Sequence, residues 1–192
     1  SGISGDMTLG AFIDMGVEAA AIPSAVRSMG LPDLRITTET VNKCGFRSIT
    51  VKIDHPPEHA HRHLHHITEM IDRATEVDPA AKEIAHRIFG HVAEAEAKVH
   101  GTTLEKVHFH EVGAADSIAD IVGSAIGWDL LAADRIVCAP IPTGQGAVTI
   151  AHGRVSIPAP ATAELLKGAP LAPSAVRAEL TTPTGAAIVT TV

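Results

Sequence analysis

The chain has 192 residues, of which 45% are hydrophobic and 19% charged, with a formal net charge of −7. These values suit one soluble globular domain, or a fragment of a longer protein, and no apolar run is long enough to span a membrane. The negative charge and the 3% of aromatic residues argue against binding to polymeric nucleic acid. Two distant cysteines, Cys44 and Cys138, and the lack of a signal-peptide pattern favour the cytoplasm.

A glycine-rich turn opens the chain, at residues 2–6, and apolar spacing from Leu9 predicts a helix that ends at Gly16. Backbone N–H groups at such a turn can bind an anion. The alternative is an ordinary helix start, and Asp6 would repel a phosphate unless a metal ion lay between them. Such turns normally follow a strand in α/β proteins, so we expect that a first strand precedes this sequence. A second helix is predicted over 23–29.

Alternating apolar residues over 33–54 predict a β-hairpin that turns at residues 43–46. A histidine-rich loop follows at 55–66, in which prolines interrupt regular structure and six histidines crowd together. Imidazole is a good ligand for nickel, zinc and copper, so the loop can gather metal. A solvated linker without ordered ligation is the alternative.

Two helices are then predicted, one from Leu64 to about Ala74 and a longer one from Pro79 to Gly101, capped by Asp78. The apolar stripe of the longer helix runs through Ile88 and Val92. The remaining polar residues of this helix are expected at the surface, without a catalytic role: His86, His91, Glu94, Glu96 and His100.

Residues 107–121 form the densest group of potential ligands in the sequence. If 107–111 are extended, His108 and His110 share one face, and a helix from about Ala114 carries Asp116 and Asp120 on one side. Two imidazoles and up to three carboxylates suit a divalent transition metal. Hydrogen-bonded histidines and a dipole-stabilising aspartate are the alternative. Further along the helix, Gly123 and Gly127 allow close approach of a ligand or of a neighbouring helix.

The last third of the chain predicts a short buried strand at 135–139, a loop at 140–146 and a helix at 158–166. Residues 179–187 predict a strand, a turn and a new helix. The fold class is therefore α/β, with α+β possible: helices packed on a small mixed sheet, with the hairpin and the histidine-rich loop inside one domain. No internal repeat is present.

Several of these stretches together resemble the nickel-insertion proteins of the LarC type. The resemblance extends over nearly the whole chain, through the segments 2–11, 93–101, 108–118 and 182–187. It implies a pyridinium-3,5-bisthiocarboxylic acid mononucleotide nickel chelatase, which makes the nickel-pincer nucleotide cofactor of lactate racemase at the expense of CTP, with Mn²⁺ or Mg²⁺. It also implies a second, C-terminal half, associated with CTP binding and oligomer formation, that is absent from this sequence.

On this hypothesis the candidate residues fall into three groups. The candidate nickel ligands at the site are His108 and His110. The histidines of the loop would bind nickel and deliver it to them: His59, His61, His63, His65 and His66. The candidate catalytic carboxylates are Glu111, Asp116 and Asp120, one of them a general base for the proton that leaves the pyridinium ring. The candidate phosphate-binding residues are Gly2, Ser4, Gly5, Asp6, Thr184 and Gly185.

Two other functions fit the same residues. A nickel storage or delivery module without catalysis would bind several ions loosely through the histidine-rich loop. A metal-dependent phosphohydrolase would hydrolyse a phosphate ester without the C-terminal half.

Overall fold

The structure is a computed structural model that describes residues 2–31, 33–57, 62–109, 112–150 and 152–192. The helices are α1 (Gly5–Asp14), α2 (Ala21–Ser28), α3 (Leu64–Arg73), α4 (Pro79–His100), α5 (Ala115–Leu131), α6 (Pro160–Leu165) and α7 (Pro183–Thr191). The strands are β1 (Arg35–Lys43), β2 (Phe46–Asp54), β3 (Ile141–Pro142), β4 (Ala147–Ile150), β5 (Gly153–Ser156) and β6 (Leu171–Ala172).

The longest helix, α4, begins and ends where its sequence predicts. Asp78 occupies the N-cap position and Pro79 the first helical position, where the missing N–H of proline has no partner to lose. Gly101 ends the helix in the left-handed conformation, with φ of 61°. The same kinds of signal predicted α1, α2, α3 and α5 to within a few residues, and all four are confirmed.

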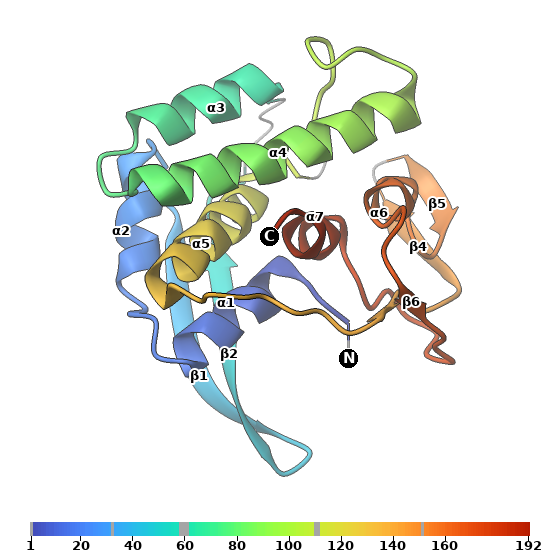
Figure 1. Cartoon of the computed structure of the whole chain (residues 1–192), viewed down its shortest axis with the longest axis horizontal. Coiled ribbons are helices and arrows are strands. Elements are labelled where there is room, and N and C mark those ends of the chain that lie inside the picture. Colours follow the sequence, from blue (N-terminus) through green and yellow to red (C-terminus); the bar gives the residue numbers. More distant parts are fainter. Residues whose placement is uncertain (1, 32, 58–61, 110–111, 151) are drawn as a thin grey trace.

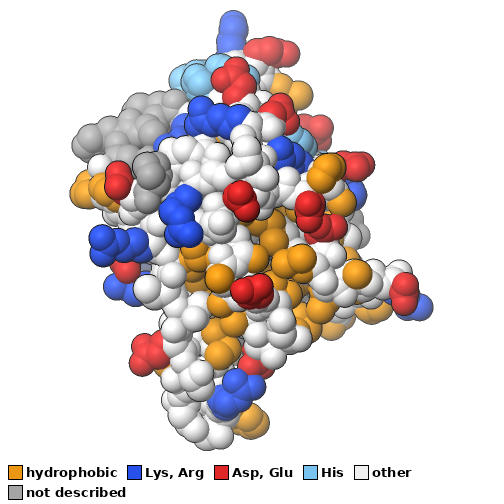
Figure 2. Space-filling view, turned by 90° about the vertical axis from the view of Figure 1, so that its left-hand side faces the viewer, with side chains coloured by type: hydrophobic (Ala, Val, Ile, Leu, Met, Phe, Trp, Pro, Cys, Tyr) orange, Lys and Arg blue, Asp and Glu red, His pale blue; other side chains and the backbone are white. Residues whose placement is uncertain are grey.

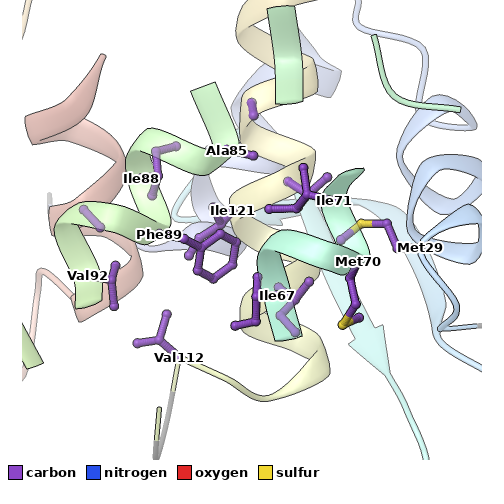
Figure 3. Packing of buried hydrophobic residues seen from close by; sticks show 14 of the residues in the cluster. Met29, Ile67, Met70, Ile71, Ala85, Ile88, Phe89, Val92, Val112 and Ile121 are labelled. Carbon is purple, nitrogen blue, oxygen red and sulfur yellow. The ribbon is translucent and has the colours of Figure 1, made fainter. Parts of the chain in front are cut away.

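Helices α3, α4, α5 and α7 enclose the larger hydrophobic core. In Figure 1, α3 and α4 lie side by side across the top of the molecule, with α5 below α4. Side chains from α3, α4 and α5 point toward one another in Figure 3, and Ile67, Ile71, Phe89 and Ile121 are fully buried. Burying each such side chain contributes roughly 1.5–3 kcal/mol. This core holds α5, and hence its N-terminal acidic residues, in a fixed position.

A second core lies between α1, α2, α5 and the hairpin. A Cβ added at Gly123 would lie 2.8 Å from side-chain carbons of Ile22 and Leu9, and one at Gly127 would lie 2.4 Å from the Phe12 ring. Both glycines therefore allow close helix packing, which was one of the two interpretations of these positions.

The predicted hairpin is confirmed as β1 and β2, antiparallel from Arg35 opposite Asp54 to Lys43 opposite Phe46. Its turn is made by Cys44 and Gly45, both with positive φ, 53° and 87°. The hairpin projects from the body at the bottom of Figure 1 and of Figure 2. Its inner end packs on α1, where a Cβ at Gly10 would lie 2.8 Å from the Ile49 carbonyl oxygen.

The mixed α/β class is confirmed, although the named strands form three separate two-stranded sheets. β3 pairs with β6 in parallel, and β4 pairs with β5 antiparallel. The predicted strand at 135–139 is wrong: these residues are irregular, and Val137 is 73% exposed. The apolar composition of 135–139 suggested burial, but the segment forms no β-pairing with any strand in the described part of the chain. None of the helices in the described ranges has an apolar stretch of the length that a membrane span requires.

Candidate functional site

The two ends of the described chain pair with each other. Ile3 and Thr181 form a parallel bridge, in which the Ile3 N–H donates to the Leu180 carbonyl (2.9 Å) and the Thr182 N–H donates to the Ile3 carbonyl (3.1 Å). Helices α1 and α7 begin directly after this pairing, at Gly5 and Pro183. The glycine-rich turn and the C-terminal turn, which lie far apart in the sequence, are therefore adjacent.

The N-terminus of α5 joins the same junction, because Asp120 packs against the backbone of Gly5. A Cβ on Gly5 would lie 2.3 Å from both Cγ and Oδ2 of Asp120. The two other glycines of the junction are equally tight: a Cβ on Gly2 would lie 1.6 Å from the Leu180 carbonyl oxygen, and one on Gly185 would lie 2.1 Å from that of Ile3. These glycines are required for packing, and their predicted phosphate contacts remain predictions.

Three carboxylates lie close enough at the junction to interact electrostatically: Asp6 on α1 and Asp116 and Asp120 on α5, which we call the acid cluster. Burial, followed by the negative charges of Asp6 and Asp116, raises the pKa of the Asp120 carboxyl to about 8. Asp120 Oδ1 is buried and has no hydrogen-bond partner in the described part of the chain. A buried carboxylate oxygen without a donor is costly, and a cation or a proton would relieve that cost.

The other members of this region are held by short-range hydrogen bonds. Asp116 Oδ1 accepts from the Ser117 N–H at 2.7 Å, and Asp6 Oδ1 accepts from the Ser4 hydroxyl. Thr182 caps α7, since its Oγ1 accepts from the Gly185 N–H at 3.2 Å. Ser4, Asp6, Thr184 and Gly185 thus lie around one junction, as their common predicted role requires.

A separate group of imidazoles, the histidine cluster, consists of His63, His65, His66 and His108. The rings of His63 and His108 have centroids 3.9 Å apart, as do those of His65 and His66. Histidine side chains gather near the top of the face shown in Figure 2. Part of the histidine-rich loop therefore lies beside His108, a position from which it could pass a metal ion to that residue.

Hydrogen bonds orient two of these rings. His63 Nδ1 donates to the Val107 carbonyl at 2.9 Å, which leaves the lone pair of the neutral ring on Nε2, the atom suited to a metal. His66 Nδ1 accepts from the His63 backbone N–H at 3.1 Å, which places the proton of a neutral His66 on Nε2. His63 is therefore the better prepared ligand of the two.

Arg62 links the histidine cluster to the start of α5. Its carbonyl accepts from the Phe109 N–H at 3.0 Å, and its guanidinium Nη1 donates to the Gly113 carbonyl at 2.7 Å. The antiparallel bridge between Arg62 and Phe109 agrees with an extended chain at Phe109, one of the residues predicted to be extended. The loop from His108 to Asp116 thus connects the two clusters.

Within the described ranges, no group of three or more His, Cys, Asp or Glu side chains is arranged so as to hold a metal ion. Four predicted site residues lie outside those ranges, namely His59, His61, His110 and Glu111. The acid cluster and the histidine cluster each supply ligand atoms of the right chemistry, without a complete shell.

One expectation about α4 is wrong. Glu96, assigned to a solvated face, is only 8% exposed. It contacts His100, whose Nε2 lies 3.2 Å from Glu96 Oε2. The sequence spacing does indicate that Glu96 lies on the buried face, because Glu96 and His100 continue the i, i+4 series of the buried residues Ile88 and Val92.

A carboxylate cluster with one buried oxygen, together with grouped imidazoles on a mixed α/β scaffold, suits a metal-handling protein. The chain belongs to the nickel insertion protein family, whose model matches residues 1–192. It is 45% identical over 97% of its length to a pyridinium-3,5-bisthiocarboxylic acid mononucleotide nickel insertion protein of Staphylococcus epidermidis, and 44% over 99% to one of Desulfitobacterium hafniense. A relative from Rhodopirellula baltica, whose name also refers to nickel insertion, is 62% identical over 100% of the chain.

The chain spans about half the length of these relatives: 47% of the first two and 48% of the third. No solved structure matches it.

Proposed function

We propose that this chain supplies the metal-handling part of a protein that inserts nickel into pyridinium-3,5-bisthiocarboxylic acid mononucleotide. The observation that carries the proposal is the acid cluster, where Asp120 Oδ1 is buried beside two further carboxylates and has no hydrogen-bond partner among the described residues. The family membership and the names of two relatives supply the metal and the substrate class.

The proposed reaction replaces a ring C–H bond by a carbon–nickel bond. Ni²⁺ accepts the electron pair of the carbon, and the ring proton passes to a base on the protein. Asp120 suits this base, since the pKa of its carboxyl, about 8, lies close to physiological pH. Asp116 and Glu111 would complete or orient the site. The junction of Gly2, Ser4, Gly5, Asp6, Thr184 and Gly185 would hold the phosphate, with a cation between it and Asp6.

The histidine cluster would hold nickel before insertion. His63 offers Nε2 to a metal, and its ring lies against that of His108. His59, His61 and His110 would add further imidazoles. His65 and His66 are exposed, so an incoming ion can reach them.

Nickel binding tests this assignment. We expect His63→Ala with His108→Ala to lower nickel stoichiometry by about one ion per chain, measured by equilibrium dialysis and metal analysis of protein purified without a nickel column. His86→Ala is the matched control, because His86 is bonded to Asp72, at 2.8 Å, on the exposed side of α4. Asp120→Asn should leave histidine-bound nickel in place and abolish cofactor formation by the complete protein. Unchanged stoichiometry in the double variant and unchanged cofactor formation in Asp120→Asn would rule out the assignment.

A nickel delivery module without chemistry is the second candidate, favoured by the exposure of His65, His66 and His108. On that function the double histidine variant loses nickel and Asp120→Asn has no effect on cofactor formation by a complete maturation system. The two functions therefore differ in the behaviour of Asp120.

Four finer expectations belong to this proposal and rest on the resemblance or on the sequence. They are CTP use with Mn²⁺ or Mg²⁺, a lactate racemase-type apoenzyme as cofactor recipient, oligomer formation through the second half, and a cytoplasmic location.

A further inference from the structure

We propose that a cavity outside both clusters is a first binding site for the planar heterocyclic ring of a mononucleotide, of the pyridinium class, which the ring occupies before it reaches Asp120. The cavity, which we call the ring pocket, lies between the C-terminal end of α4, the β4–β5 hairpin and the N-termini of α6 and α7, and has a volume of about 310 Å³. The inference rests on the proposed function for the identity of the ring, and on the residues of the pocket for the site itself.

Most of the ring pocket is apolar. Its lining includes small and branched residues from five elements: Val99, Ile150, Val155, Ala159, Pro160, Ala161 and Pro183. Such walls offer van der Waals contact to a flat ring and few hydrogen bonds to water. Ligand sites combine this kind of lining with a small number of polar groups that fix orientation.

The polar groups of the pocket are Glu96, His100 and His152. Glu96 has a side chain only 10% exposed, and His100 Nε2 lies 3.2 Å from its Oε2. The ring of His152 packs against that of His100, with centroids 4.8 Å apart. Two imidazole faces and a buried carboxylate thus occur together in an apolar cavity.

This combination favours a cationic aromatic ring over a neutral one. Imidazole faces can stack on a planar ring. The Glu96 carboxylate, held in surroundings of low polarity, attracts a ring that carries positive charge. A pyridinium has both properties, whereas a pyrimidine base has only the first.

The position of α7 connects the ring pocket to the acid cluster. Pro183, the first residue of α7, lines the pocket, and Gly185 two residues later packs under Ile3 at the junction. A volume near 300 Å³ is at the lower limit for ligand sites, so it suits a substituted ring rather than a whole mononucleotide. The phosphate would then remain outside, toward the N-terminus of α7, where a helix favours negative charge.

The test is a titration of the complete protein with nicotinic acid mononucleotide, a stable pyridinium mononucleotide, in metal-free buffer. Ala161→Phe places a large side chain in the ring pocket and should raise the Kd at least about tenfold, or roughly 1.4 kcal/mol. Ala163→Phe, at an exposed position of the same short helix, is the control and should leave the Kd unchanged. An equal Kd in both variants and the parent would overturn the proposal.

Charge preference is tested by Glu96→Gln, which keeps the shape of the side chain. It should weaken binding of nicotinic acid mononucleotide more than about threefold and leave binding of uridine monophosphate within error. Tighter binding of uridine monophosphate by the parent protein would overturn the pyridinium assignment. Circular dichroism of each variant establishes whether it is folded. If Glu96→Gln does not fold, the Kd of Ala161→Phe still tests whether the ring pocket binds the mononucleotide.

Failure of this inference can be separated from failure of the proposed function by measuring nickel on the same proteins. Nickel binding without any mononucleotide binding contradicts the ring pocket alone. Mononucleotide binding that Ala161→Phe abolishes, in a protein that takes up no nickel, contradicts the proposed function and supports the ring pocket as a site.

Discussion

At the scale of single residues, Asp120 makes the stability of the fold depend on pH. Burial and the neighbouring carboxylates raise its pKa to about 8, above the ordinary value of 3.8. Between these values the folded chain holds a proton that the unfolded chain has lost, so the free energy of unfolding falls as the pH rises from about 4 to 8. The effect has the opposite sign to that of a salt-bridged carboxylate.

We therefore expect Asp120→Asn to be more stable than the parent at pH 8, by about 2–5 kcal/mol, and nearly equal to it at pH 4. Urea unfolding at both pH values measures the difference. Asp129→Asn, near the other end of α5, is the control and should not flatten the pH dependence. A parent protein whose stability rises between pH 4 and 8, with no change in Asp120→Asn, would contradict the prediction.

At the scale of elements, substitution by alanine should change stability in opposite directions at two helical glycines, one at the start of α1 and one inside α4. Gly5→Ala would place a methyl group 2.3 Å from the Asp120 carboxyl, so we expect a loss of several kcal/mol in stability. Gly90→Ala, inside α4, meets no atom of the described residues within 4 Å outside its own helix and should stabilise by roughly 0.5–1 kcal/mol. Thermal unfolding of both variants measures these changes in stability. A Gly5→Ala variant as stable as the parent would mean that α1 and α5 are not packed this closely.

The helices and strands also show which features of the fold are predictable from the sequence. Local signals were sufficient where one element determines its own limits, as with Pro79 and Gly101 of α4 or the turn at Cys44 and Gly45. They failed at 135–139, because an apolar run becomes a strand only if a partner pairs with it. The ligand types of the site were predictable from the residues, whereas the placement of Asp120 against Gly5 depends on packing between distant segments.

At the scale of the whole molecule, the pairing of residues 2–4 with 180–182 joins the two ends of the described chain beside the acid cluster. Removal of residues 1–4 deletes the two backbone hydrogen bonds of Ile3 and the two that the Ser4 carbonyl accepts from the N–H and hydroxyl of Thr8, so we expect a loss of about 2 kcal/mol or more. Urea unfolding checks this loss. Removal of Ser1 alone is the control, and equal stability of both truncated forms would show that the pairing contributes little.

The pairing of Ile3 with Thr181 also sets the order of events during biosynthesis. Residues far apart in the chain must meet before the junction of α1 and α7 is complete, and pairing over this range slows folding. A nascent chain can assemble α3, α4 and the histidine cluster before α7 has left the ribosome. We therefore expect the protein to be able to collect an ion through its imidazoles before its proposed phosphate site is complete.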